Sequence, residues 1–318
     1  MAPSALEVRV AQTANDFDAE SYTTLVGFDG DWRDGWWHDD YLALVGERVG
    51  LSDCQRVLDL GCGAGHWGLR LLPLCAENAR MVGVDREAAF LDAARARAVS
   101  RGLAERVDYR HAVGESLPFD DDHFDLATCQ TVLMHVTDAA AVLRELVRVV
   151  RPGGLVLVAE PDNTVNAISA DRRGQDIGET LAMLELQLLC AEGKRLSGHG
   201  DESVGGRLFS LFSEAGLQDV EAWTNDCTSP MEPPYAGAWQ QLEVTMMRDA
   251  RHHLDLMQAR QRSHFTLAGG TDARFDELWA LQAAILGRKL DALEAGTFQR
   301  PGGFLHYLCA GRVSAPTP

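Results

Sequence analysis

Short apolar runs alternate with longer amphipathic stretches between residues 56 and 160. The apolar runs that predict buried strands are residues 56–60, 81–85, 107–111, 124–130 and 155–160. The stretches between them predict helices over about 66–77, 87–101 and 138–150, and Pro73 should kink or shorten the first. This alternation predicts an α/β fold with a doubly wound, mainly parallel sheet and helices on both of its faces.

The C-terminal half has a more helical pattern. It predicts helices over residues 176–192, 204–215, about 235–262 and about 272–295. Two more strands, 217–225 and 304–313, bring the sheet to seven. We therefore predict no separate second domain. Residues 1–50 should form an N-terminal helical lid, and residues 51–318 one domain with helical cap insertions at about 163–216 and 229–300.

The charge balance restricts the class of partner. The 318 residues include 29 basic and 47 acidic ones, which gives a formal net charge of -18. Such a surface repels phosphate backbones and anionic membranes, so we expect neither a nucleic acid nor a membrane as partner. A small molecule is the expected substrate, and the long helical insertion would also suit a homodimer.

The seven cysteines are odd in number, widely scattered and without a CxxC pair. This pattern indicates reduced thiols and neither a disulfide framework nor a zinc site. Glu7 and Arg9 interrupt the apolar residues near the start, so no signal-peptide core is evident. The chain also lacks an apolar run of the roughly 18 residues that suggest a membrane span. We expect a cytoplasmic protein.

Residues 57–68, VLDLGCGAGHWG, join the first predicted strand to the first helix. Glycines at such a junction let a ligand approach the backbone and the free N–H groups of the helix start. Asp85 ends the next strand, where a carboxylate can accept both hydroxyls of a ribose. Gly63, Gly65 and Gly68 also satisfy G-x-G-x-x-G, so an NAD(P)-dependent oxidoreductase stays an alternative. A tight turn, with Asp85 capping the next helix, is the purely structural alternative.

The form D-L-G-C-G-A-G at 59–65 resembles the first motif of class I S-adenosylmethionine (SAM)-dependent methyltransferases, especially their ubiquinone/menaquinone-type and sterol-type small-molecule branch. VGVD at 82–85, ESLPF at 115–119, DDDHFD at 120–125, LATCQTVLMHV at 126–136 and RPGG at 151–154 follow in the order typical of that family. The resemblance covers about residues 55–160. It implies a Rossmann-like methyltransferase fold, SAM as cofactor, and methyl transfer to O, N or C of a small organic molecule.

The same resemblance implies a set of cofactor-binding positions. They are Asp59, Gly61, Gly63 and Gly65 around the methionine part, Asp85 and Arg86 at the ribose, Val113, Gly114 and Glu115 at the adenine, Cys129 and Gln130 at the end of the fourth strand, and Trp37 from the lid. Many relatives carry an acidic residue where Val113 stands. The adenine amino group would then be bound by backbone or by Glu115. A non-catalytic SAM-binding partner protein is a further alternative.

Methyl transfer requires alignment of the acceptor, and it requires a general base only if the acceptor loses a proton. His135 follows the fourth strand close to the expected methyl position, and imidazole has a suitable pKa. His38 could reach the site if the lid folds over the cofactor, and Glu160 ends the fifth strand, where such sheets bind ligands. A packing role is the alternative for each of the three. No His, Cys or carboxylate spacing is typical of a metal site, so none is predicted.

Overall fold

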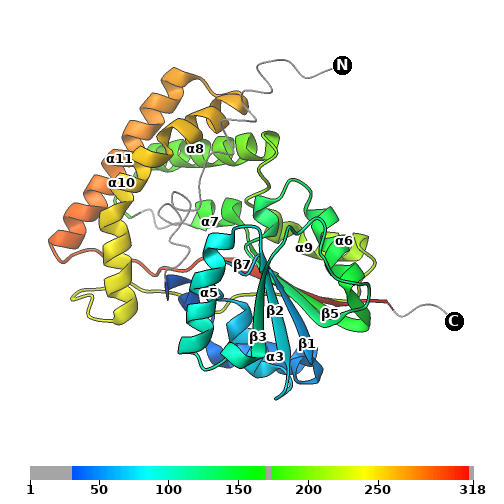
Figure 1. Ribbon diagram of the computed structural model, residues 1–318. Helices are drawn as coiled ribbons and strands as arrows, with labels where there is room; N and C mark the ends of the chain where they lie inside the picture. The colour runs from blue at the N-terminus through cyan, green and yellow to red at the C-terminus, as the bar shows by residue number, and fades with distance from the viewer. Residues whose placement is uncertain (1–30, 170–172, 315–318) are drawn as a thin grey trace, which may run out of the picture. The chain divides into compact units, whose positions relative to one another are not determined.

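The computed structural model describes residues 31–169 and 173–314 (Figure 1), and these fall into two compact units. Within the described residues, the sheet unit contains 31–166, 200–228 and 303–314. The helical unit contains 167–169, 173–199 and 229–302. The chain therefore leaves the sheet unit and returns to it twice.

The sheet has seven strands in the order β3-β2-β1-β4-β5-β7-β6. Their bounds are β1 Arg56–Leu60, β2 Arg80–Asp85, β3 Val107–His111, β4 Phe124–Gln130, β5 Val150–Pro161, β6 Gln218–Thr224 and β7 His306–Arg312. Strands β1 to β5 pair in parallel, whereas β7 runs antiparallel between β5 and β6. The predicted seven-stranded, mainly parallel sheet is thus confirmed.

Strand β5 begins earlier than the sequence predicts, and it includes the RPGG segment. Arg151 supplies the physical reason, because its Nε donates to Oδ1 of Asp125 at 2.6 Å and holds this stretch beside β4. The register between β4 and β5 shifts between Phe124 and Leu126, which accommodates the irregular start. These contacts give the RPGG segment a structural role.

Five helices belong entirely to the sheet unit: α3 Asp39–Val49, α4 Gly68–Leu71, α5 Ala88–Ser100, α6 Ala139–Val149 and α9 Leu208–Glu214. The predicted helix at 66–77 is much shorter, because Pro73 turns its second half into a 3-10 turn at Leu72–Leu74. The side chain of Asp138 caps α6 by accepting from the N–H of Ala141 at 2.8 Å. Helix α7 (Asn163–Ser169) carries the chain from one unit to the other.

Alternate residues of the strands enter two separate hydrophobic cores, one on each face of the sheet. Val57, Met81, Leu155 and Leu157 join the core that contains residues of α3, α4 and α5. Leu58, Val84, Val156 and Val158 join the core that contains residues of α6 and α9. Because successive side chains of a strand point to opposite faces, this division confirms the doubly wound arrangement.

The helical unit is built from α8 (Ile177–Leu196), α10 (Ala238–Leu267) and α11 (Asp272–Glu294), which lie together in Figure 1. Phe265, Phe275 and Leu278 are fully buried between them. A Cβ on Gly193 would lie 1.8 Å from the carbonyl oxygen of His264, so α8 and α10 approach each other closely at this glycine. No described helix is long and apolar enough to cross a membrane.

The two units differ from the organisation expected from sequence. The three long helices cluster as a unit of their own, whereas we expected no second domain. Residues 200–216, expected in the first insertion, cluster with the sheet. Of the expected lid, residues 1–30 lie outside the described part, and 31–50 belong to the sheet unit. The lid and cap roles stay predictions.

Candidate functional site

The order of the strands defines where this sheet should bind a ligand. From β1 the chain winds outward through β2 and β3, and it then returns to place β4 on the other side of β1. Ligands bind such sheets at this switch point, beyond the carboxyl ends of the strands. The loops after β1 and β4 meet there, because a Cβ on Gly61 would lie 2.3 Å from Cγ2 of Val132.

The loop between β1 and α4 depends on its glycines. Gly61, Gly63 and Gly65 have φ angles of 64°, 50° and 83°, in the left-handed region that side chains disfavour. Gly65 also lies close to Ala94 on α5, whose Cα would be 3.3 Å from an added Cβ. The φ angles and the close approach to α5 therefore both require glycine in this loop at the switch point.

Asp59 lies just before the glycine loop and is almost fully buried. Its Oδ2 accepts from the N–H of Gly68 at 3.1 Å, whereas its Oδ1 has no hydrogen-bond partner among the described residues. Burial, with a smaller contribution from the charge of Asp85, raises the pKa of Asp59 to about 8. A buried acceptor without a donor is costly, so this carboxyl group is suited to a ligand that brings a donor or a positive charge.

Asp85 connects the glycine loop to the turn that follows β2. Its Oδ2 accepts from the N–H of Gly63 and its Oδ1 from the N–H of Glu87, both at 2.8 Å. Burial raises its pKa, although the two amides oppose the shift. The bond to Glu87 closes a turn ahead of α5, whose N-cap is Glu87 itself, so Asp85 does not cap that helix. Each oxygen keeps a second lone pair, so the carboxylate can still accept ribose hydroxyls.

The three predicted adenine positions lie on the stretch after β3. Val113 is 47% exposed and forms an isolated bridge with Ser116. Gly114 packs against Leu60, the last residue of β1, at 3.4 Å from an added Cβ. Glu115 is exposed, as is the predicted ribose residue Arg86. The stretch therefore contacts the end of β1, and its polar side chains are accessible.

The end of β4 carries the next two predicted residues. Cys129 is fully buried, and burial raises the pKa of its thiol, which argues against a nucleophile. Nε2 of the buried Gln130 has no partner among the described residues. Thr131 follows with a φ of 53°, and its N–H donates to the carbonyl of Ala159 at 2.9 Å. This bond turns the chain away from β4 at the switch point.

Glu160 fixes the turn that follows β4. Its Oε1 accepts from the N–H groups of Val132 and Leu133, both at 2.7 Å, and its Oε2 accepts from that of Met134 at 3.2 Å. The side chain is completely buried. Its carboxylate thus organises the 3-10 turn Leu133–His135, whose last residue is the half-buried His135. The geometry supports a positioning role for Glu160, and its contact with a substrate stays a prediction.

A family model described as a methyltransferase domain matches residues 58–158, which contain the glycine loop, Asp85 and the turn after β4. The chain carries a class I SAM-dependent methyltransferase domain. Its strand order, glycine loop and acidic strand end agree with that assignment.

The methyltransferase domain is similar to curated bacterial proteins. The ubiquinone/menaquinone biosynthesis C-methyltransferase UbiE of Proteus mirabilis is 40% identical over 114 residues, which is 36% of this chain and 45% of that protein. The uncharacterized methyltransferase YcgJ of Bacillus subtilis is 34% identical over 131 residues, 39% of this chain and 50% of that protein. The chain thus spans about half the length of the curated relatives it matches.

Solved structures are similar to this chain at low sequence identity. A chain in the complex between the Haloferax volcanii Trm112 methyltransferase activator and a methyltransferase is 18% identical, with a TM-score of 0.50. The match covers 94% of this chain and 99% of that one. The structure of YcgJ from Bacillus subtilis is 21% identical, with a TM-score of 0.49 and coverage of 87% and 100%.

The sequence gives no signal for an ionic network that holds residues 31–37 against the methyltransferase domain. Asp34 contacts Nδ1 of His66, in the glycine loop, at 3.1 Å, and Arg101 after α5 at 2.5 Å. Burial alone would raise the pKa of Asp34, but the hydrogen bond with His66 and the charge of Arg101 hold it below its usual value. This network joins three segments that are distant in the sequence.

An aromatic cluster beside β7 was also missed. His306, the first residue of β7, is fully buried, and its ring centroid lies 4.4 Å from Trp36 and 4.6 Å from Phe304. Neither ring nitrogen has a hydrogen-bond partner among the described residues. Burial, with a contribution from Arg33, lowers the pKa of His306 to about 3, so the ring is neutral near pH 7. A lone histidine in a C-terminal strand gives no such indication.

Trp37 and His38 lie at the start of α3. Trp37 is 2% exposed and packs against Trp67 at 5.6 Å between ring centroids, so core packing accounts for its burial. His38 is exposed, and its Nδ1 lies 2.7 Å from Oδ2 of Asp226. Contact of either residue with a cofactor stays a prediction.

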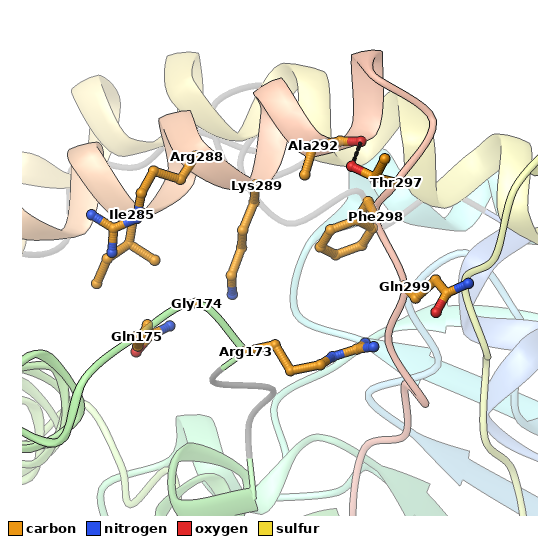
Figure 2. A pocket seen from close by; sticks show the side chains of 10 residues that line it. All are labelled: Arg173, Gly174, Gln175, Ile285, Arg288, Lys289, Ala292, Thr297, Phe298 and Gln299. Carbon is orange, nitrogen blue, oxygen red and sulfur yellow. Dashed lines mark hydrogen bonds between the residues drawn. The ribbon is translucent and has the colours of Figure 1, made fainter.

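The helical unit has a pocket of about 240 Å³ between residues 173–175 and the C-terminal part of α11 (Figure 2). Its lining contains Arg173, Gly174, Gln175, Ile285, Arg288, Lys289, Ala292, Thr297, Phe298 and Gln299. Arg288 is paired with Glu179 at 2.7 Å, which compensates part of the positive charge. We assign no chemistry to this pocket.

Proposed function

We propose that this protein transfers the methyl group of SAM to an oxygen, nitrogen or carbon atom of a small organic acceptor. The main support is the glycine loop at the switch point, fastened to Asp85 and adjoining the partnerless oxygen of Asp59. The relatives named C-methyltransferases favour carbon as the acceptor atom. The net charge of -18 disfavours nucleic acid as the acceptor.

The residues at the switch point fit the cofactor. The backbone of Gly61, Gly63 and Gly65 would admit the methionine part of SAM, because none of the three carries a side chain and their positive φ angles turn the loop at the end of β1. Asp59 would accept from its amino group, and Asp85 would accept from the ribose hydroxyls while keeping its bonds to the loop. Bound SAM supplies an activated methyl group on a positively charged sulfur.

Additional contacts of the cofactor are proposed from the family resemblance. Val113, Gly114 and Glu115 would flank the adenine, and the exposed Arg86 would lie near the ribose. The end of β4, with its Cys129 and Gln130, would lie at the amino group, and Trp37 would shield the sulfonium. The partnerless Nε2 of Gln130 supports this assignment, because a ligand acceptor would satisfy it.

The residues after β4 would align the acceptor. Glu160 holds three consecutive amides of the turn, so it would act as a positioning residue for His135. His135 is the proposed general base for acceptors that lose a proton, because it is half-buried at the end of that turn. His38 is a second proposed base, and its pairing with Asp226 would hold the ring in place.

Calorimetric titration of the purified protein with SAM, S-adenosylhomocysteine and NAD tests the cofactor. We expect both adenosyl sulfur compounds to bind and NAD not to bind. Asp85→Asn should weaken SAM binding by about tenfold to a hundredfold, because one hydrogen-bonded charge is lost. Asp92→Asn on the exposed face of α5, which pairs with Arg95 at 2.8 Å, is the matched control and should bind SAM normally.

The outcomes separate the alternatives. Binding of NAD without either sulfur compound would replace this proposal by an oxidoreductase. Binding of SAM without formation of S-adenosylhomocysteine in a screen of small acceptors would favour a non-catalytic SAM-binding partner protein.

We also propose a cytoplasmic location and a homodimer. The location is supported by the seven cysteines, all of which are unpaired. The homodimer is supported by exposed apolar side chains on α8, where Ile177, Leu181 and Leu188 are 75%, 59% and 41% exposed. Sedimentation at several protein concentrations tests the oligomeric state.

A further inference from the structure

Three potential metal ligands converge where α3 begins and β6 has ended. Nδ1 of His38 lies 2.7 Å from Oδ2 of Asp226 and 3.3 Å from Sγ of Cys227. The three ligand atoms all lie within 4.8 Å of one another. The sequence does not indicate this cluster, because His38 lies 188 positions before Asp226 in the chain.

The spacing suits a tetrahedral cation of the zinc class. Metal–ligand distances of about 2.0 to 2.3 Å place neighbouring ligands of a tetrahedral zinc roughly 3.3 to 3.6 Å apart. The separation of 3.3 Å between Sγ of Cys227 and Nδ1 of His38 meets this value. The separation of 2.7 Å between Nδ1 and Oδ2 of Asp226 is shorter, and rotation of these partly exposed side chains can widen it.

The backbone holds the three residues together before any ligand binds. Oδ1 of Asp226 accepts from the N–H of His38 at 3.2 Å. The hydroxyl of Tyr41, on α3, donates to the carbonyl of Thr224, the last residue of β6, at 2.7 Å. A site that is already assembled loses less conformational freedom on binding a metal.

The arrangement also favours a positive charge at its centre. Both Asp226 and Cys227 approach the same nitrogen of His38, so a carboxylate and a sulfur atom meet at one point. Asp40 adds negative charge to the surroundings, whereas the charge of Arg70 is paired with Asp39 at 2.5 Å.

We propose that His38, Asp226 and Cys227 bind one zinc-class divalent cation and leave its fourth position open. A set of one nitrogen, one oxygen and one sulfur ligand suits zinc, and three protein ligands with an open position are typical of a catalytic site. His38 is 59% exposed and Asp226 26%, so a cation can enter from solvent. Binding releases the proton of the Cys227 thiol and uses Nδ1 of a His38 ring protonated on Nε2, so a metal-bound His38 would not act as the second proposed base.

This site lies at the same edge of the sheet as the glycine loop. Strand β6 runs parallel to β5, since both are antiparallel to β7, and Asp226 follows its carboxyl end. The open position can take a water molecule or an oxygen, nitrogen or sulfur atom of another ligand. The proposal of the metal itself does not depend on methyl transfer.

Cobalt titration of full-length, tag-free protein, freed of metals with a chelator, tests the site. We expect one Co²⁺ per chain, a sulfur-to-cobalt charge-transfer band in the near ultraviolet, the strong visible bands of four-coordinate Co²⁺, and loss of all bands when Zn²⁺ is added. Cys227 is the natural reporter, because it is half-exposed whereas the other six cysteines are buried. Cys227→Ser should abolish the charge-transfer band, and Asp226→Asn should weaken binding about tenfold or more.

The control is His252→Ala, which removes an exposed histidine of the helical unit and should leave the bands unchanged. A wild-type protein without the charge-transfer band overturns the proposal, as does Co²⁺ binding that Cys227→Ser leaves intact. SAM titration of the same samples monitors folding of the Cys227→Ser variant. It also separates failure of the metal site from failure of the proposed methyltransferase, because the cofactor residues are distinct from the three ligands.

Discussion

The buried His306 should make the sheet unit less stable in mild acid. Its folded pKa is about 3, against an ordinary value of 6.5. Because the folded pKa is lowered, the unfolded chain binds more protons between these two values, so stability falls as the pH drops from about 6.5 towards 3. His306→Phe keeps a ring among Trp36 and Phe304 but cannot be protonated.

The magnitude follows from the two pKa values. At pH 5 the unfolded histidine is mostly protonated, about 1.5 pH units below its ordinary pKa, whereas the buried ring is neutral. At about 1.4 kcal/mol per unit, this costs the fold about 2 kcal/mol relative to pH 7. The phenylalanine also removes two buried nitrogens without partners, but its larger ring can strain the packing. We therefore compare the change in stability with pH and not the stability itself.

Urea unfolding at pH 7 and pH 5 measures this change, followed by tryptophan fluorescence because Trp36 and Trp37 pack beside the ring. Between the two pH values, wild type should lose about 2 kcal/mol more of its unfolding free energy than His306→Phe. His252→Gln, at an exposed position, should behave as wild type. If His306→Phe loses as much stability as wild type on acidification, the ring of His306 is not a buried neutral group and the reasoning is refuted.

Three shorter predictions concern the methyltransferase domain. Gly61→Ala should cost about 2 kcal/mol or more of stability and weaken SAM binding, because its Cβ would lie 2.3 Å from a methyl of Val132 at a φ of 64°. Gly102→Ala, with a φ of 68° and open space around it, is the matched control in urea unfolding, and an equal cost in both would exclude the clash as the cause. Glu160→Gln should lower the unfolding free energy by about 1–3 kcal/mol in the same assay. The carboxylate accepts from three N–H groups, and the amide nitrogen that replaces one of its oxygens cannot accept. An unchanged value would contradict the role of Glu160 in the turn. Asp59 has a folded pKa of about 8, so the unfolding free energy should fall as the pH rises from about 4 to 8. Asp59→Asn should remove this fall between pH 5 and pH 8 in unfolding curves, yet weaken SAM binding in calorimetry. If the fall persists in the variant, another group titrates.

Much of the fold could be predicted from the chain because the sheet is buried on both faces. Its strands are short apolar runs in which Val57 and Leu58, or Leu157 and Val158, enter opposite cores. Such runs stand out between amphipathic helices, so the seven strands and most helix positions were predicted correctly. Strand β5 was predicted to begin too late, at residue 155, because a contact made across the sheet extends it over the RPGG segment.

The division into two units could not be predicted in the same way. An apolar helical face shows that a helix packs, but it does not show against which element. Phe265, Phe275 and Leu278 would suit a cap on the sheet as well as a bundle of their own. The pairing is decided by shape, such as the close approach at Gly193, which no periodicity reveals.

The candidate site was predictable only where a local motif supplies the chemistry. The glycine loop and Asp85 lie within one β-α-β unit, so their spacing in the sequence is also their arrangement in space. Asp34 with His66, and His38 with Asp226, come together only through tertiary folding. Glu160 was noticed for its place at a strand end, but the three amides that engage it could not be foreseen.

The position of β7 has a consequence for the newly made chain. This strand comes last in chain order, yet it pairs with β5 on one side and β6 on the other. Until it emerges from the ribosome, two strands of the sheet present unpaired N–H and C=O groups along their inner edges, and such edges invite pairing with other chains. The acidic surface of the protein opposes that encounter by electrostatic repulsion between copies. Changes that slow the pairing of β7 would therefore prolong the exposure of these two edges and favour aggregation during synthesis.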